Sequence, residues 1–519
     1  MRTLPLLNPI NKQKSTIGIF GGINRLEAAA ADNEFSEMTN MSSDAFPAMC
    51  PRNPRGEVIK TLEKPHGLYW KNGLAYVDGT EFWYKDEKVA DVEDSDKKLV
   101  GMGAYIVMLP DKTILNTSTG EYGSMEATWE QPEGTTATFE PTYDASVYTR
   151  IKCTGIGKNF SQGDGVTISG CTKEAFNKSA ILQSVEDDAI VVINQTSETF
   201  TQSSGLVIKR EMPDMDFITE ADNRLWGCSS EKHEIYACKL GDPKNWNCFE
   251  GISTDSYAAT VGSDGDFTGC ITHMGTVLFF KEDYIHKVFG NKPSNIQINT
   301  YPFRGVAKGA EKSLCIVNET LYYAARFDIV SYEGSLPESI SEKLGELRIE
   351  DATAEQYNNK YYISVKTPKG SETYVYDTFK KLWHREDDTF FKYAEYAEGK
   401  LYIIDQDNNL REIENPEGEE KVCWEAASAE QSESDLNKKR ITHIQILAEI
   451  EPETLFEVYM QYDSIPVWER VYTKRSIKKE SVRVTVSPRK CDCFRWRING
   501  QGKFAVYALA KTVKHGSPR

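Results

Sequence analysis

Short apolar runs separated by tight turns recur along most of the chain. The clearest example is Asp264 to Gly290 (DGDFTGCITHMGTVLFFKEDYIHKVFG), where runs at 268–272, 276–281 and 284–289 are separated by His273-Met274-Gly275 and Glu282-Asp283. Each run has the length of a β-strand, and each interruption contains residues that favour turns. The stretch therefore predicts three antiparallel strands joined as a meander.

The same order of an apolar run, a turn and a second run ending in an aromatic residue appears on both sides of this stretch. In 67–89, Asn72-Gly73 and Asp78-Gly79 lie between apolar runs, and both dipeptides tolerate the positive φ angles of a hairpin turn. Further units lie at 98–122, 216–250, 310–335, 355–387 and 393–414. About seven units of roughly 35–45 residues are typical of propeller blades.

We therefore predict an all-β fold built around a β-propeller of about seven blades, which closes into a ring and so leaves few exposed strand edges. A set of independent β-sandwiches is the alternative, and it explains the repeated unit less well. The predicted blades occupy 61–127 and 211–420. Between them, 128–210 has longer strands and different turns, which predicts an inserted small β-barrel or β-sandwich.

The two ends of the chain have patterns of their own. Residues 1–60 contain five prolines that interrupt any long element, and they are expected to form an extended N-terminal arm. Within this arm, 32–41 predicts a helical turn with Phe35 and Met38 facing inward. Residues 421–519 contain six alternating runs and predict a C-terminal β-sandwich, or an outer wrap on the ring.

Composition and charge narrow the possible partners. The 519-residue chain has a formal net charge of −17 and no run of Lys or Arg, so tight binding of nucleic acid by phosphate contacts is not expected. No window of about 18 apolar residues predicts a membrane span, and the N-terminus lacks the apolar core of a signal peptide. Eleven cysteines are scattered along the chain, which predicts reduced, buried thiols in a protein made in the cytosol.

The sequence contains no motif that identifies catalytic, cofactor-binding or metal-binding residues. We therefore predict that the protein is not an enzyme and binds no cofactor or metal. Ser263 to Asp266 approaches the Asp-box turn of sialidase-type propellers but lacks its Trp and is not repeated. The acid pairs Asp187-Asp188 and Asp387-Asp388 fall at turns, where solvated acids are the ordinary interpretation. His286 and His384 are expected to pack or lie at the surface, and Cys491 and Cys493 are too close together for a usual zinc site. Gly21-Gly22 is not followed by the remaining glycines of a dinucleotide-binding motif.

Adjacent aromatic pairs occur in three of the predicted units. They are Tyr322-Tyr323, Tyr361-Tyr362 and Phe390-Phe391. Neighbouring residues of a strand face opposite sides of the sheet, so packing between blades explains these pairs. A sugar-binding or partner-binding surface is the alternative.

Three stretches carry a resemblance to a known family. The first is the N-terminal series Phe20-Gly-Gly-Ile-Asn24, Asp32-Asn-Glu-Phe35, Met38-Thr-Asn-Met41, Ala45-Phe-Pro47 and Pro51-Arg52; the others are 264–290 and the pair 468–472 (WERVY) and 494–502 (FRWRINGQG). They resemble β-propeller tail proteins of double-stranded-DNA bacteriophages, in particular the packaged-DNA stabilisation proteins, or tail hubs, of short-tailed phages. The insert at 128–210 is not part of that family's pattern.

The resemblance implies a structural virion protein, made in the host cytoplasm, whose copies form a ring in the head–tail neck or tail hub. Its implied partners are a portal or adaptor ring above and a tail needle, tube or spike below. Such a ring retains packaged DNA, and duplex passes through it at ejection without tight binding. The alternative function is a tail-tip or adhesin-type propeller that binds host surface glycan through the insert.

Overall fold

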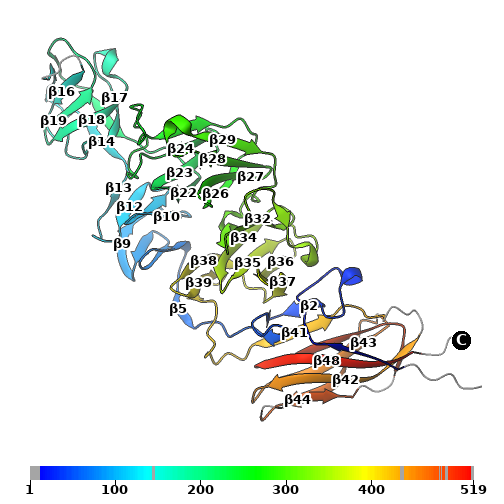
Figure 1. The fold of residues 1–519 in the computed structure, drawn as a ribbon. Helices are drawn as coiled ribbons and strands as arrows, with labels where there is room; N and C mark the ends of the chain where they lie inside the picture. Colours follow the sequence, from blue (N-terminus) through cyan, green and yellow to red (C-terminus); the bar gives the residue numbers. More distant parts are fainter. Residues whose placement is uncertain are drawn as a thin grey trace, which may run out of the picture. The chain divides into compact units, whose positions relative to one another are not determined.

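The computed structural model describes residues 12–142, 147–432, 438–463, 465–478, 480, 482–485 and 489–515 (Figure 1). The fold is all-β, with nearly every strand paired antiparallel to its neighbours. The described part of the chain also contains five one-turn 3-10 helices: η1 (Glu27–Ala29), η2 (Glu174–Phe176), η3 (Pro293–Asn295), η4 (Glu311–Ser313) and η5 (Glu342–Leu344). The chain divides into two compact units, one formed by 1–62 with 308–519 and the other by 63–307.

The 63–307 unit contains four four-stranded sheets in chain order. Their strands are β6 (Pro65–Trp70), β7 (Leu74–Asp78), β8 (Glu81–Tyr84) and β9 (Glu87–Asp91); β10 (Lys98–Met102), β11 (Tyr105–Leu109), β12 (Thr113–Asn116) and β13 (Tyr122–Ser124); β22 (Phe217–Ala221), β23 (Arg224–Ser229), β24 (Glu234–Ala237) and β25 (Tyr257–Thr260); β26 (Phe267–His273), β27 (Thr276–Lys281), β28 (Tyr284–Phe289) and β29 (Gln297–Tyr301).

Successive sheets of this unit pack against one another. The first strands are neighbours in order, β6 beside β10, β10 beside β22 and β22 beside β26. Side chains from facing sheets then form shared apolar cores, as where Val107 and Ile114 meet Leu225 and Tyr236. An isolated four-stranded sheet would expose both faces to water, so each sheet gains its stability from its neighbours.

An insert interrupts the series after β13. Its eight strands form one antiparallel sheet: β14 (Ala127–Glu130), β15 (Ala137–Pro141), β16 (Tyr148–Lys152), β17 (Gly165–Ser169), β18 (Ser179–Glu186), β19 (Ala189–Ile193), β20 (Phe200–Gln202) and β21 (Val207–Arg210). They enclose a core of their own, in which Phe139 stacks on Phe200 and both rings contact Phe176. The sequence predicts an inserted β domain over nearly the same residues, 128–210.

Polar contacts fasten the insert to the loop between β24 and β25. Asp164 accepts hydrogen bonds from Arg210 (2.5 Å) and from the fully buried Asn245 (3.0 Å), whose own Oδ1 accepts from the Gly165 N–H (2.9 Å). Lys239 donates to the Gly163 carbonyl (2.9 Å). The insert is therefore held by a buried network in addition to its two connecting chains.

Replacing 127–210 with two glycines is expected to leave one cooperative unfolding transition at a lowered midpoint. Ala127 and Arg210 are paired across β14 and β21, so a short linker can join the two ends. The insert's core goes with it, and the buried Asn245 keeps its bond to Asp242 but loses those to Asp164 and Gly165. Leaving such a buried group partly unsatisfied costs about 1–3 kcal/mol. Urea unfolding followed by tryptophan fluorescence measures the effect. A broad or multi-step transition would instead make the insert integral to the neighbouring sheets.

The other unit contains three further four-stranded sheets. Their strands are β30 (Cys315–Val317), β31 (Thr320–Ala324), β32 (Ile329–Tyr332) and β33 (Glu338–Ser339); β34 (Asp351–Tyr357), β35 (Lys360–Thr367), β36 (Gly370–Asp377) and β37 (Leu382–Arg385); β38 (Phe391–Ala397), β39 (Lys400–Asp405), β40 (Asn409–Glu412) and β5 (Val58–Thr61). The last sheet is thus completed by a strand from near the start of the chain, with Asn409 paired to Thr61.

Two five-stranded sheets form the C-terminal part of the same unit. One contains β1 (Lys12–Ile17), β48 (Phe504–His515), β42 (Lys439–Ile450), β45 (Val482–Val484) and β46 (Arg489–Cys491); the other contains β2 (Phe35–Thr39), β41 (Cys423–Ser428), β47 (Phe494–Gln501), β43 (Leu455–Tyr462) and β44 (Glu469–Arg475). They pack face to face, since Trp424 and Phe456 of one sheet contact Phe504 of the other. A small ribbon of β3 (Met41–Ser42) and β4 (Cys50–Pro51) also forms in this unit.

The first 60 residues therefore contribute strands to larger sheets where the sequence predicts a separate arm. β1 and β2 belong to the C-terminal sheets and β5 to the last four-stranded sheet. The helical turn predicted at 32–41 is wrong, because 35–39, half of that segment, is strand β2. A β-bulge between Phe35 and Glu37 turns both Phe35 and Met38 inward, and this reproduces the i, i+3 spacing of a helix face.

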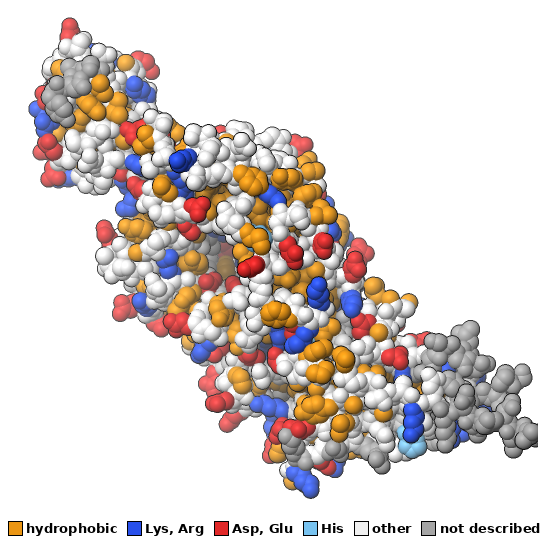
Figure 2. Space-filling view, viewed as in Figure 1, with side chains coloured by type: hydrophobic (Ala, Val, Ile, Leu, Met, Phe, Trp, Pro, Cys, Tyr) orange, Lys and Arg blue, Asp and Glu red, His pale blue; other side chains and the backbone are white. Residues whose placement is uncertain are grey.

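Acidic and basic side chains are interspersed over the face of the molecule in Figure 2. No continuous stripe of Lys and Arg crosses the part of the surface seen there. This mixed charge is unlike the basic footprint of proteins that bind nucleic acid by phosphate contacts. Among the helices that the structure describes, none has the length and apolar character needed to cross a bilayer.

Candidate functional site

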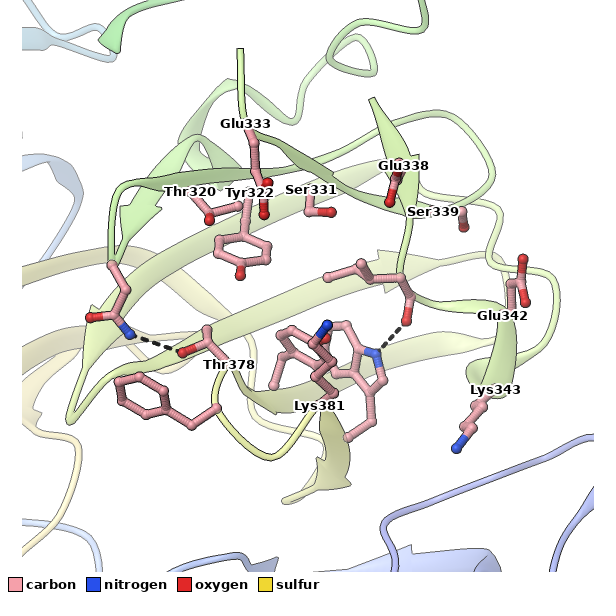
Figure 3. A pocket seen from close by; sticks show the side chains of 15 residues that line it. Thr320, Tyr322, Ser331, Glu333, Glu338, Ser339, Glu342, Lys343, Thr378 and Lys381 are labelled. Carbon is pink, nitrogen blue, oxygen red and sulfur yellow. Dashed lines mark hydrogen bonds between the residues drawn. The ribbon is translucent and has the colours of Figure 1, made fainter. Parts of the chain in front are cut away.

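Two features of the 1–62/308–519 unit are candidates for a functional site. The first is a groove with a volume of about 440 Å³ between the sheets β30–β33 and β34–β37 (Figure 3). Its wall on one side comes from β31, β32 and β33, and on the other from β36, β37 and the turn between them. Tyr322, Tyr376 and Trp383 form its base, and Phe379 lies at the exposed turn.

The aromatic base of the groove is rigid. Tyr322 stacks on Tyr361 with ring centroids 5.2 Å apart, and Tyr376 lies 4.9 Å from Trp383. The Trp383 indole N–H donates to the Ile340 carbonyl (2.7 Å), which ties the two sheets together beneath the groove. The expected packing of aromatic pairs between sheets is seen here for Tyr322 and Tyr361.

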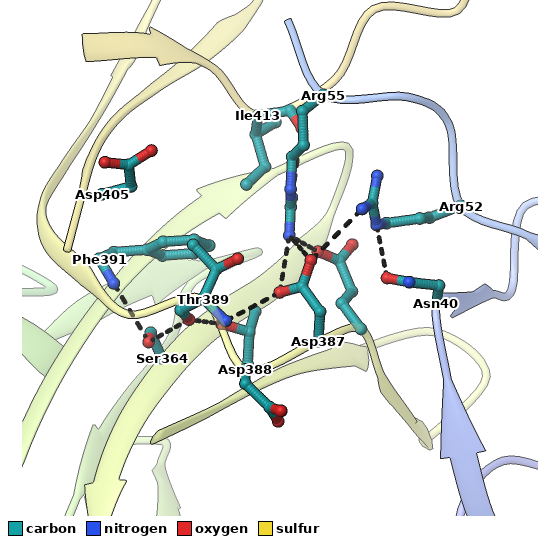
Figure 4. A network of polar contacts seen from close by, with 12 residues as sticks. Asn40, Arg52, Arg55, Ser364, Asp387, Asp388, Thr389, Phe391, Asp405 and Ile413 are labelled. Carbon is teal, nitrogen blue, oxygen red and sulfur yellow. Dashed lines mark hydrogen bonds and ion pairs between the residues drawn. The ribbon is translucent and has the colours of Figure 1, made fainter. Parts of the chain in front are cut away.

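The second candidate feature is a buried charge network that joins residues 20–56, here called the N-terminal strap, to the loop after β37 (Figure 4). The Arg55 guanidinium lies 2.7 Å from Glu386 Oε2 and 3.2 Å from Asp387 Oδ2. Arg52 lies 3.3 Å from the same Asp387 oxygen and donates to Asn40 Oδ1 (2.8 Å).

The charges in this network set one another's ionisation. Burial raises the pKa of Asp387, but the charges of Arg55 and Arg52 outweigh it and lower that pKa to about 2. Burial lowers the pKa of Arg55, and attraction by Glu386 and Asp387 reverses this into a net rise. For Arg52, burial and the like charge of Arg55 together lower the pKa. The shifts of Asp387 and Arg55 favour their charged forms, whereas the shift of Arg52 opposes its charge, so the ion pair of Arg55 with Asp387 is the stabilising centre of the network.

Hydrogen bonds and ion pairs continue along the strap toward the C-terminal sheets. The Ile23 N–H donates to the Trp383 carbonyl (2.7 Å), and Arg25 holds Glu372 with two hydrogen bonds (2.5 and 3.1 Å). Ser43 donates to Asp377 (2.6 Å), and Met49 exchanges backbone hydrogen bonds with Val506. The strap thus connects β36 and β37 to β48 of the C-terminal sheets.

The residues considered in the sequence fall in separate places. Asp187 and Asp188 are exposed at a turn, as expected of solvated acids. Asp387 is not a solvated turn acid as the sequence predicts, because it lies in the charge network. The sequence pattern gives no sign that it pairs with Arg52 and Arg55. His286 is buried, and its ring nitrogens lie 2.9 Å from the Ser263 and Thr300 hydroxyls; burial lowers its pKa to about 4.

His384 is also buried, and burial lowers its pKa to about 4. Cys491 and Cys493 are buried free thiols, and all eleven cysteines are free. No group of three or more metal-ligating side chains occurs among the residues that the structure describes. The structure therefore does not bring the candidate residues of the sequence together into one constellation.

Comparisons with known proteins add little to this picture. No family model and no curated protein matches the sequence. One similar solved structure is the computationally designed Ika8 protein, with a TM-score of 0.34 and 10% identity over 69% of this chain and 100% of that chain. Another is BamB from Moraxella catarrhalis, with a TM-score of 0.33 and 8% identity over 70% of this chain and 98% of that chain. A third is the Pyrococcus horikoshii acylaminoacyl peptidase, with a TM-score of 0.29 and 10% identity over 79% of this chain and 60% of that chain. Scores this low support no conclusion about the function of this chain.

Proposed function

We propose that this chain is a non-catalytic structural protein of a double-stranded-DNA phage particle. In this proposal several copies form a ring in the head–tail neck or tail hub, between a portal or adaptor ring and a tail needle, tube or spike. The ring retains packaged DNA and lets it pass at ejection.

The observation that carries the proposal is the N-terminal strap. Many of the residues that resemble the phage family, such as Phe20 to Asn24, Phe35 and Arg52, are buried and hydrogen-bonded at junctions between sheets, although Asp32 and Phe46 are exposed. Gly22, for example, leaves no room for a side chain beside the Trp383 carbonyl. Motif residues used in this way suit a protein whose task is mechanical rigidity.

We further propose that the seven four-stranded sheets close into one propeller. Only residues 62–64 separate β5, the last strand of the seventh sheet, from β6, the first strand of the first sheet. Three residues span at most about 14 Å between flanking Cα atoms, so this connection favours closure. A terminal strand that completes the last sheet also removes an open edge.

Retention of DNA by this protein would be mechanical. A formal net charge of −17 opposes phosphate contacts, and acidic groups facing a channel would repel duplex and keep it from sticking. The isolated chain is expected to be monomeric and to form its ring on the portal or adaptor template.

Particles that lack this protein are expected to package DNA and then leak it, measured as nuclease-sensitive genome after assembly. Purified protein is expected to bind duplex weakly at physiological salt. Tight, salt-sensitive duplex binding would contradict the proposal. Mutant particles that keep their genomes and fail to adsorb would favour the glycan-binding alternative.

A further inference from the structure

The groove between β30–β33 and β36–β37 contains polar groups that the protein itself leaves without partners. Tyr376 is only 7% exposed and lines the groove, and its hydroxyl forms no hydrogen bond with another described residue. The carboxylates of Glu333, Glu338 and Glu342 have no hydrogen-bond or ion-pair partner in the described structure either. The three carboxylates are exposed, and the Tyr376 hydroxyl is open to the groove, so a ligand can replace the water that hydrates these groups.

The groups around the groove point to a polyhydroxylated ligand. Carboxylates accept hydrogen bonds, the Lys381 ammonium only donates, and the Tyr376 hydroxyl does both. A sugar ring offers hydroxyls that donate and accept, so one ligand can satisfy all three kinds of group. The Phe379 ring is 72% exposed at the same groove and is free to stack against the apolar C–H face of a pyranose.

The charges of the groove exclude other ligand classes. Three carboxylates and Lys381 line the groove, and Lys343 is already paired with Glu34 (2.7 Å), so the excess negative charge would repel an anionic ligand. A basic peptide would meet the carboxylates well, but its cationic side chains would face Lys381 with like charge. A neutral sugar avoids both conflicts.

The groove is formed before any ligand arrives. Asn318 donates to the Thr378 hydroxyl (3.0 Å), which in turn donates to the Asn359 carbonyl (2.7 Å), so the turn that carries Phe379 is tied at its base to the facing sheet. Preformed walls lower the entropy lost on binding. The volume of about 440 Å³ lies in the range of small-molecule sites.

We propose that this groove binds a neutral mono- or disaccharide unit of a glycan. The assignment depends on residues 318–383 alone and is independent of the proposed role in genome retention. It also differs from the alternative function considered above, in which the insert at 128–210 is the binding module.

The test uses the full chain and a panel of neutral sugars (glucose, galactose, mannose, N-acetylglucosamine and their common disaccharides), with saturation-transfer NMR for detection and calorimetry for affinity. Binding of at least one sugar is expected. Tyr376→Phe is expected to weaken it roughly five- to tenfold, the loss of about one hydrogen bond, without lowering the unfolding midpoint, because the hydroxyl has no partner in the free protein.

Phe379→Ala is expected to weaken binding by a similar factor, and Phe249→Ala, which removes an exposed Phe from the other unit, is expected to leave it unchanged. Absence of binding across the panel at 20 mM sugar (about the weakest affinity worth detecting) would overturn the proposal. Binding that is insensitive to both groove variants would also overturn it. Saturable binding of a tri-arginine peptide that is lost in the same variants would assign the groove to a basic peptide instead.

Discussion

Gly22→Ala is expected to destabilise the protein by about 3 kcal/mol or more, or to prevent folding. A Cβ at Gly22 would lie 2.1 Å from the Trp383 carbonyl oxygen, and both groups are backbone, so no flexible side chain can give way. The strap must then move off β37, and the hydrogen bond from the Ile23 N–H to that carbonyl is lost. Denaturant unfolding measures the change in free energy.

Gly18→Ala provides the matched control. It lies four residues earlier, and a Cβ there would meet nothing within 4 Å. Its effect is expected to stay within about 1 kcal/mol of zero, and a small gain is reasonable because alanine restricts the unfolded chain. Equal stability of the two variants would show that the strap does not lie against β37 as described.

Arg55→Met is expected to cost about 3–5 kcal/mol, because it leaves Glu386 and Asp387 buried without their main partner. Arg52 does not replace Arg55, because its guanidinium forms ion pairs with Asp387 and Glu420 and none with Glu386. Adding Glu386→Gln and Asp387→Asn to the same variant is expected to recover part of the loss, since the uncompensated charges are removed. Arg470→Met, which breaks the exposed pair with Glu457, is expected to cost at most about 1 kcal/mol.

The same network gives the protein a pH dependence. Asp387 has a pKa of about 2 in the folded protein, below its ordinary value, so its ionised form stabilises the fold above about pH 4. This stability is lost as the pH falls from about 4 to 2, when the folded-state carboxylate is protonated. In Arg55→Met the loss over that window is expected to be smaller. Parallel urea titrations at pH 6, 4 and 3 test this, and identical pH slopes in the two proteins would contradict the assigned role of Arg55.

Local sequence pattern predicts the repeated hairpins well and the distant pairings poorly. The strands at 276–281 and 284–289 match β27 and β28, because both are bounded by turn residues that act locally. Lys85-Asp86 adopts positive φ at both positions without a glycine, so the turn into β9 carries no strong signal. β1, with the sequence KQKSTI, has no apolar alternation, and its identity as a strand depends on β48 at the far end of the chain.

The charge network and the groove show that candidate functional sites, like distant strand pairings, are poorly predicted from local sequence pattern. Asp387 looks like a turn acid in the sequence, and its partner Arg55 is 332 residues away. The aromatic pair Tyr322-Tyr323 is visible in the sequence, but the groove beside Tyr322 is lined by residues of two sheets, among them the small Ser331 and Ser339 and the large Tyr376. Such spacing between sheets is a property of packing, which periodicity does not encode.

The pairing of β1 with β48 also determines when the protein can finish folding. Lys12 is paired with Lys514, so at a ribosomal rate of roughly 5–20 residues per second the first strand waits about 25–100 s for its partner. Residues 63–307 are contiguous and can fold while synthesis continues, and the sheet of β5 can follow once β40 has been made. The sheets that contain β1 and β2 must wait for β48 and β47, which lie near the end of the chain. When several ribosomes translate one mRNA, the unpaired N-terminal strands of their nascent chains therefore lie close together. If translation ends before β48 is made, β1 stays unpaired and can pair with a strand of a neighbouring chain.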